Sequence, residues 1–255
     1  MNTVPQLMVL HGLGATTDQF NGMFDTHFPD APIAMNMPGH GERPRENGRA
    51  SFDRFAALAL DALDQLQVGS VTLAGISMGS GIAVKMARQR PEMVNGLILM
   101  RPAWMDKPNP ANLKIIRDIG VWLSQGTQDE AIERLNADPF YADLAHSNPA
   151  AAKSILGAIT RPHASDYAEV LTQIVEDSPL ASLAELEALT TKTMVVGTPD
   201  DPLHPIEIAQ AWAAKIPDAT LCELPSKYTA PAAFQSELEA ALDQFLSPTS
   251  TKISE

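Results

Sequence analysis

The sequence has little cysteine and little positive charge. Its 255 residues include a single cysteine, Cys222, and 18 lysines and arginines against 31 aspartates and glutamates, for a formal net charge of −13 at pH 7. One cysteine excludes an internal disulfide framework and any cysteine-rich metal site. The acidic balance argues against binding along a phosphate backbone, which requires clustered lysine and arginine. We therefore expect neither nucleic acid nor a metal as a partner.

Long apolar runs are missing as well. No stretch of 18 apolar residues is present that could cross a membrane, and the first residues lack the basic region of a secretory signal. We expect no membrane association, and the cytoplasm is the default location. The phosphate-binding pattern G-x-x-x-x-G-K-[ST] and the zinc pattern H-E-x-x-H do not occur, so no cofactor is expected.

Short apolar runs alternate with amphipathic stretches along most of the chain. The runs predict buried parallel strands at residues 6–10, 31–37, 70–74, 94–100, 193–197 and 220–224. Helices are predicted at residues 51–68, 78–90, 205–215 and 231–245, the first of them capped by Ser51. Strands alternating with helices predict an α/β fold, a doubly wound and mostly parallel sheet with helices on both faces. The loops at the carboxyl ends of the strands then meet at one edge.

The alternation stops between residues 104 and 189. This stretch is helical by composition and has proline-rich joints, such as Asn148 followed by Pro149, which is typical of a helix start. A crossover of this length cannot be one helix. We predict four or five short helices inserted as a cap over the sheet edge. The α/β core then comprises residues 1–103 and 190–247, and residues 248–255 form a flexible polar tail.

The pentapeptide GISMG at residues 75–79 lies between a predicted strand and a predicted helix. A strand, turn and helix in this order is the setting that a G-x-S-x-G nucleophile elbow requires. The glycines permit a turn so tight that the serine is strained and its hydroxyl exposed. Ser77 is therefore the candidate nucleophile, provided that a neighbouring base removes its proton.

The tetrapeptide HGLG at residues 11–14 follows the first strand. A glycine-lined loop there, with Gly12 in it, can direct a backbone N–H at a developing oxyanion. Leu13 is the predicted donor, and Met78 supplies a second N–H from the start of the following helix. We interpret His11 as a structural residue that bonds loop carbonyls.

Four motifs in a fixed order carry a resemblance to a known family. HGLG at 11–14, MPGHGERP at 37–44, GISMGSG at 75–81 and GTPDDPLHP at 197–205 resemble the α/β-hydrolase family. The resemblance covers nearly the whole chain, with the inserted helices in the place of the variable cap. It implies a nucleophile, an acid and a histidine in that chain order. Asp201 fits the acid position best, and Asp200 is the alternative.

The histidine is absent from the place where this family carries it, the loop after the last strand. That loop, LPSKYTAP at residues 224–231, contains Lys227 but no histidine. His204 lies on the loop of the presumed acid and is the first candidate for the base. The alternatives are His40 on another loop at the same edge, which we also place among the substrate-binding residues, then Lys227, a cap histidine (His146 or His163), or no base at all.

These observations predict a hydrolase of a small carboxylic ester, thioester or related acyl substrate, acting through an acyl-Ser77 intermediate. The catalytic set is Ser77, Asp201 and His204. The incomplete family pattern leaves two alternatives open: a non-hydrolytic enzyme, such as an epimerase, lyase or cyclase, or a ligand-binding protein on the same scaffold. The expected partner is a small molecule, whose identity the sequence leaves open together with the oligomeric state.

Overall fold

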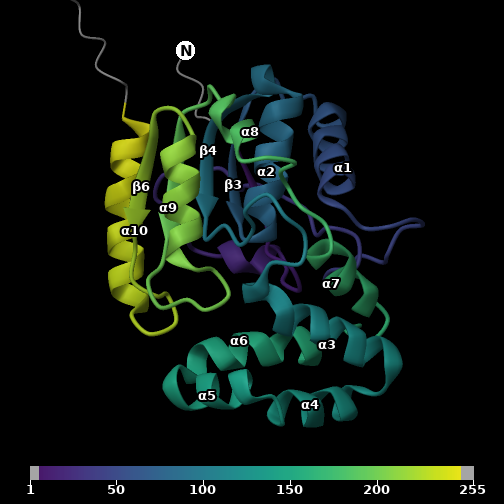
Figure 1. The fold of residues 1–255 in the computed structure, drawn as a ribbon. Coiled ribbons are helices and arrows are strands. Elements are labelled where there is room, and N and C mark those ends of the chain that lie inside the picture. The colour runs from purple at the N-terminus through teal and green to yellow at the C-terminus, as the bar shows by residue number, and fades with distance from the viewer. Residues whose placement is uncertain (1–5, 248–255) are drawn as a thin grey trace, which may run out of the picture.

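The computed structural model describes residues 6–247, which are built around a six-stranded parallel sheet (Figure 1). The strand order is β2-β1-β3-β4-β5-β6. The strands are β1 (Leu7–Leu10), β2 (Ile33–Ala34), β3 (Val71–Ile76), β4 (Val94–Met100), β5 (Thr193–Gly197) and β6 (Ala219–Glu223). All the pairings are parallel, which confirms the predicted doubly wound α/β fold. The predicted tail, 248–255, lies outside the described residues.

Both faces of the sheet are covered by helices, as predicted. Along β1, Met8 and Leu10 join the apolar cluster of one face, whereas Leu7 and Val9 join that of the other. This alternation follows from the two-residue period of a strand. The first face is covered by α1 (Phe52–Gln65), α2 (Met78–Gln89) and α9 (Ile206–Lys215). The second is covered by η1 (Thr17–Phe20) and α10 (Pro231–Leu246).

Strand β2 is much shorter than predicted. Only Ile33 and Ala34 pair with β1, although the apolar run extends over 31–37. The next residues bond to the loop after β1 instead of to the strand. The Asn36 carboxamide oxygen accepts the Thr17 N–H at 3.0 Å, and the Met37 N–H donates to His11 Nε2 at 2.9 Å. The pairing with β1 therefore ends early, because Asn36 and Met37 form hydrogen bonds with residues that follow β1.

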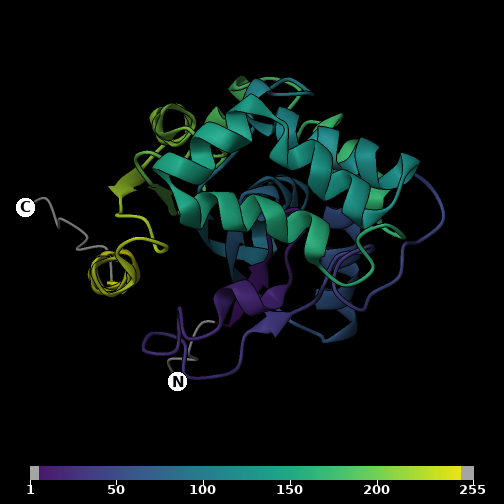
Figure 2. The same ribbon diagram turned by 90° about the horizontal axis from the view of Figure 1, so that it is seen from below.

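The segment at 104–189 forms helices and no strand. It contains η3 (Ala111–Leu113), α3 (Lys114–Gln125), α4 (Gln128–Asn136), α5 (Pro139–Ser147), α6 (Pro149–Thr160), α7 (Ala168–Val175) and the four-residue α8 (Ala184–Glu187). Helices α3 to α6 lie across the end of the sheet to which the strand arrows point (Figures 1 and 2). Asn148 caps α6 by accepting the Ala151 N–H at 3.1 Å, with Pro149 in the first turn, as predicted. Arg161 joins these helices to the core by donating to the Gly39 carbonyl at 3.1 Å.

The turn between β3 and α2 depends on two glycines for close packing. A Cβ atom on Gly79 would lie 1.8 Å from the carbonyl oxygen of Leu10, at the end of β1. One on Gly75 would lie 2.3 Å from the backbone of Gly79. Both clashes involve backbone atoms, which cannot rotate away. The glycines therefore allow α2 to begin directly against β1, the position from which Ser77 reaches the sheet edge.

His11 is a buried structural residue, which confirms its predicted role. Its Nδ1 lies 2.9 Å from the carbonyl oxygen of Gly12, to which it donates, and its Nε2 accepts from the Met37 N–H at 2.9 Å. The ring also contacts that of His40, at 4.7 Å between centroids. Burial lowers the pKa of His11 from 6.5 to about 4. The neutral imidazole thus ties the loop after β1 to the loop after β2.

Replacing Gly79 with alanine should destabilise the fold by more than about 3 kcal/mol, because a backbone carbonyl occupies the space that the new methyl group needs. Gly157→Ala is the matched control, since a Cβ atom there meets nothing within 4 Å. In the interior of α6 this change should stabilise by about 0.5–1 kcal/mol. Urea unfolding of both variants measures the difference. Equal effects would contradict the packing argument.

Stability should fall as the pH drops below 6.5, in part because of His11. An imidazole with a lowered folded-state pKa binds its proton more readily in the unfolded chain, so the stabilisation is complete above 6.5 and is lost towards pH 4. The loss amounts to about 3 kcal/mol, at 1.36 kcal/mol per pKa unit. His11→Asn should flatten the dependence of unfolding free energy on pH in this range. A slope equal to that of the wild type would show that His11 does not contribute.

Candidate active site

Ser77 lies where the strand order reverses. The chain passes from β1 to β2 on one side and returns to β3 on the other, so the ends of β1 and β3 flank a topological switch point. Crevices at such points are the usual ligand sites of open α/β sheets. Ser77 follows β3 directly and has φ 56° and ψ −112°, a strained conformation for a residue with a side chain. The predicted strain at the elbow is thereby confirmed.

The elbow is fixed by hydrogen bonds to the end of β4. The Ser77 N–H donates to the carbonyl oxygen of Met100 at 2.9 Å. The buried hydroxyl of Ser80 lies 2.8 Å from the carbonyl oxygen of Gly75 and 3.0 Å from that of Met100. These contacts offset the strain at Ser77, because they hold the elbow to the ends of β3 and β4.

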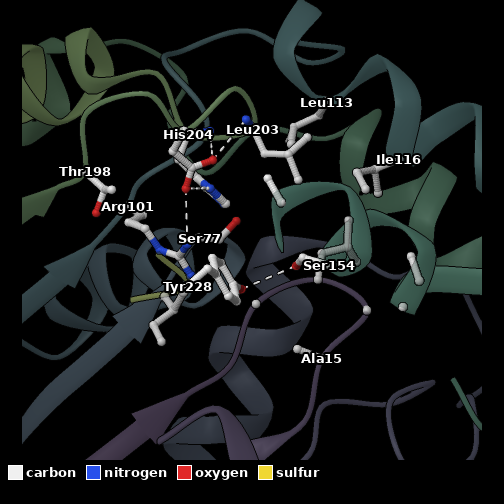
Figure 3. A pocket seen from close by; sticks show the side chains of 18 of the residues that line it. Ala15, Ser77, Arg101, Leu113, Ile116, Ser154, Thr198, Leu203, His204 and Tyr228 are labelled. Carbon is white, nitrogen blue, oxygen red and sulfur yellow. Dashed lines mark hydrogen bonds and ion pairs between the residues drawn. The ribbon is translucent and has the colours of Figure 1, made fainter. Parts of the chain in front are cut away.

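A cavity of about 210 Å³ opens beside Ser77. Its walls come from the loops at the carboxyl ends of β1, β3, β4, β5 and β6 and from the inserted helices (Figure 3). The polar groups include Gln19, Ser77, Arg101, Asn148, Ser154, Thr198, Asp200, Asp201, His204, Ser226 and Tyr228. The apolar ones include Leu13, Ala15, Ile76, Trp104, Leu113, Ile116, Ala151, Ala158 and Leu203. Side chains far apart in the sequence thus face one cavity.

Asp201 and His204, the predicted acid and base, form a pair on the loop after β5. His204 Nδ1 lies 2.8 Å from Asp201 Oδ2, and both side chains are largely buried, at 11% and 14% exposure. Oxygen Oδ1 accepts the backbone N–H groups of Leu203 at 3.1 Å and His204 at 3.2 Å. One carboxylate therefore both shapes the loop and orients the imidazole. Asp200, the alternative acid, is exposed and has a positive φ of 58°.

The charges of this pair are coupled. Burial opposes the ionisation of Asp201, but the His204 ring and the Arg101 guanidinium hold the pKa of this carboxyl well below its usual range. Burial lowers the pKa of His204 from its ordinary value, whereas Asp201 raises it. The pair thus consists of a carboxylate and a histidine that loses its proton readily, with Nδ1–H donating to the acid. Because Nδ1 is engaged with Asp201, Nε2 is the ring nitrogen left to accept a proton. Figure 3 shows the His204 ring at the cavity with Ser77.

The other candidates for the base lie elsewhere. All six histidines are within the described residues, and His204 alone among them lines the cavity. His40 is fully buried away from it, with its ring 6.3 Å from that of Phe55. His146 is exposed, and His163 pairs with Glu42 at 3.3 Å.

Lys227 is also not among the residues that line the cavity. Its ammonium lies 5.5 Å from the centre of the Tyr228 ring. Burial lowers the pKa of this lysine. Of the groups weighed for the base from the sequence, the structure therefore brings only His204 into the cavity with Ser77.

The loop after β1 lines the cavity as expected. Its backbone N–H groups are not equally free to bind a ligand. The Gly12 N–H already donates to the side-chain oxygen of Gln19 at 2.8 Å. Leu13 lines the cavity. Met78 is the first residue of α2, where a backbone N–H has no acceptor within the helix. The N–H groups of Leu13 and Met78 are thus the better candidates for binding an anion.

Two residues of the site were missed in the sequence. Arg101 follows β4 and donates from Nη1 to Asp201 Oδ2 at 3.1 Å. Its guanidinium also lies 5.8 Å from the centre of the Tyr228 ring. The Tyr228 hydroxyl lies 3.3 Å from that of Ser154 on α6, and so joins the last loop to the inserted helices (Figure 3). A charged residue directly after the apolar run at 94–100 was the signal that could have revealed Arg101.

Two further observations concern residues 6–247 alone. Over this range, histidine, cysteine, aspartate and glutamate do not gather in groups of three or more that could bind a metal ion. The helices described there are too short or too polar to cross a membrane.

Comparisons with known proteins agree with this architecture. An uncharacterized protein of Mycobacterium tuberculosis is 31% identical over 107 residues, which cover 40% of this chain and only 30% of that protein. A 2-hydroxymuconate semialdehyde hydrolase of Pseudomonas putida is 27% identical over 84% of this chain and 76% of that protein. The solved structure of a thermophilic esterase from Thermogutta terrifontis superposes with a TM-score of 0.74 at 19% identity, over 96% of this chain and 92% of the esterase. The model of the alpha/beta hydrolase fold family matches residues 5–228, and the chain therefore belongs to this family.

Proposed function

We propose that this protein is a serine hydrolase that cleaves a small carboxylic ester, thioester or related acyl compound through an acyl-Ser77 intermediate. The observation that supports it most is that one cavity contains the strained Ser77 together with the Asp201–His204 pair. A serine hydroxyl needs a base, and an imidazole held by a carboxylate is the usual one. Relatives named as a hydrolase and an esterase agree with this reaction class.

In this proposal His204 accepts the Ser77 proton through Nε2. Its Nδ1 is engaged with Asp201 at 2.8 Å, which fixes the tautomer that leaves Nε2 basic. Asp201 then stabilises the imidazolium that forms, without itself taking the proton. Among the contacts of residues 6–247, no hydrogen bond joins the Ser77 hydroxyl to His204. Such bonds are often long before substrate binds and tighten in the complex.

The tetrahedral intermediate would place its oxyanion between the N–H groups of Leu13 and Met78. Both lie at the switch point, one after β1 and the other at the start of α2, where the helix dipole favours negative charge. His204 next gives its proton to the leaving group. A water molecule, activated by the same imidazole, then attacks the acyl-serine and regenerates the hydroxyl.

The cavity favours a compact substrate. Its volume of about 210 Å³ is below the range of roughly 300–1,000 Å³ for sites that enclose drug-sized ligands. Trp104, Leu113 and Ile116 supply apolar walls around the reacting group. Helices α3 to α7 would act as a cap that excludes water, which strengthens the electrostatic interactions inside. Short apolar acyl groups are therefore the preferred substrates in this proposal.

A fluorophosphonate probe should label the native protein at Ser77. The probe forms a bond only with a serine that a base has activated, so Ser77→Ala should abolish labelling while leaving the melting temperature close to that of the wild type. Mass spectrometry of the labelled peptide identifies the site. An unlabelled but correctly folded wild-type protein would argue for one of the non-hydrolytic alternatives.

His204→Gln should lower kcat for a short activated ester by about 10²–10⁴-fold, because general-base catalysis contributes this much. Glutamine keeps the approximate size and one hydrogen bond to Asp201, so the melting temperature should change little. Lys227→Met is the paired variant, since Lys227 stands on the loop where the family carries its histidine, and it should retain most of the activity. The reverse pattern, with Lys227 essential and His204 dispensable, would overturn this assignment of the base.

A further inference from the structure

One carboxylate oxygen at the site is shared by two donors. Asp201 Oδ2 accepts from His204 Nδ1 at 2.8 Å and from Arg101 Nη1 at 3.1 Å. The side chain of Arg101 is 9% exposed, so this ion pair is shielded from solvent. The other oxygen, Oδ1, is occupied by backbone N–H groups of the loop. The negative charge of Asp201 is thus divided between the imidazole and a permanent cation.

The position of Arg101 is fixed from several sides. It follows β4 with φ 47°, a conformation that is uncommon for a residue with a side chain. Its backbone N–H donates to the carbonyl oxygen of Val196 at 2.6 Å, and its guanidinium lies over the Tyr228 ring. A strained backbone conformation persists only where the surrounding contacts hold it in place. Here it directs a buried cation at the carboxylate of Asp201. Such a group is a candidate for function.

We propose that Arg101 is a positioning residue that acts through Asp201 to keep His204 neutral, and hence able to accept the Ser77 proton, in mildly acidic solution. The inference rests on the proposed function. A carboxylate alone would favour the imidazolium, but a guanidinium on the same oxygen offsets that attraction and also repels the imidazolium directly. The direction of the pKa of His204 agrees, because burial, Arg101 and Lys227 lower it and Asp201 raises it.

The charged and titratable groups around His204 are few. Its own loop supplies Asp201 and Asp200, the end of β4 supplies Arg101, and the loop after β6 supplies Lys227 and Tyr228. The helices on the opposite wall contribute uncharged side chains, namely Leu113, Ile116, Asn148, Ala151, Ser154 and Ala158. Arg101 is the cation in contact with the acid, so its charge should have a larger effect on His204 than that of Lys227.

The experiment compares variants that separate charge from shape. Arg101→Gln keeps an N–H donor but removes the charge, Arg101→Met keeps the volume, and Arg101→Lys keeps the charge. Arg54→Gln removes a surface cation that pairs with Glu46 at 2.7 Å, and controls for the change in net charge. The acid limb of kcat/KM for p-nitrophenyl acetate is measured for each variant. The pKa of the His204 ring is measured by NMR in Ser77→Ala backgrounds.

Both neutral variants should shift the acid limb and the ring titration to higher pH by about one unit. Arg101→Lys and Arg54→Gln should leave both at the wild-type position. The proposal would be overturned if the acid limb of kcat/KM stayed in place in both Arg101→Gln and Arg101→Met. Failure of both variants to fold would also overturn it, since Arg101 would then be purely structural. If the wild type shows no Ser77-dependent turnover, the proposed function fails, but the NMR titration still tests the role of Arg101.

Discussion

The approach of helix α2 to the end of strand β1 is the contact on which the site depends. It occurs at Gly79, where even one methyl group would overlap the Leu10 carbonyl. Because β1 leads directly into the loop of Leu13, this contact places that loop beside the start of α2. Ser77 lies two residues before this contact, in its strained conformation at the sheet edge. The proposed nucleophile and the two candidate backbone donors, the N–H groups of Leu13 and Met78, are thus brought together mainly by backbone packing.

The second constraint is the loop after β5, which contains both members of the Asp201–His204 pair. Only two residues separate Asp201 from His204, and Pro202 and Pro205 restrict the backbone around them. Asp201 bonds to the backbone of the loop and to the imidazole at once. Little conformational entropy remains to be lost when the ring is oriented. A local loop thus brings together two groups that the family's usual pattern takes from separate loops.

The sequence predicted most of the fold because its signals were local. Alternating apolar runs and helix caps such as Ser51, which accepts the Arg54 N–H at 3.2 Å, require only neighbouring residues. The candidate pair Asp201 and His204 could be proposed because both follow one strand. The short β2 could not be predicted, since its end is decided by Asn36 and Met37 bonding to a distant loop.

The side-chain contacts of the site were harder to predict. Arg101 and Tyr228 were missed because their partners, Asp201 and Ser154, are distant in the sequence. His40 was expected to border the substrate because its loop reaches the same sheet edge as Ser77. The packing of His40 against His11 and Phe55 instead turns it into the core. Sequence periodicity identifies which edge a loop reaches, whereas the direction of a side chain there depends on tertiary packing.

The insertion between β4 and β5 also has a consequence for how the chain folds. Strand β4 is almost entirely apolar and pairs with β5 only after the whole of 101–192 has been made. At typical synthesis rates this leaves β4 as an open edge for on the order of ten seconds. Unpaired apolar edges are templates for aggregation. The exposure of this edge therefore ends only when β5 pairs with β4, which makes that pairing the step that protects the partly made sheet.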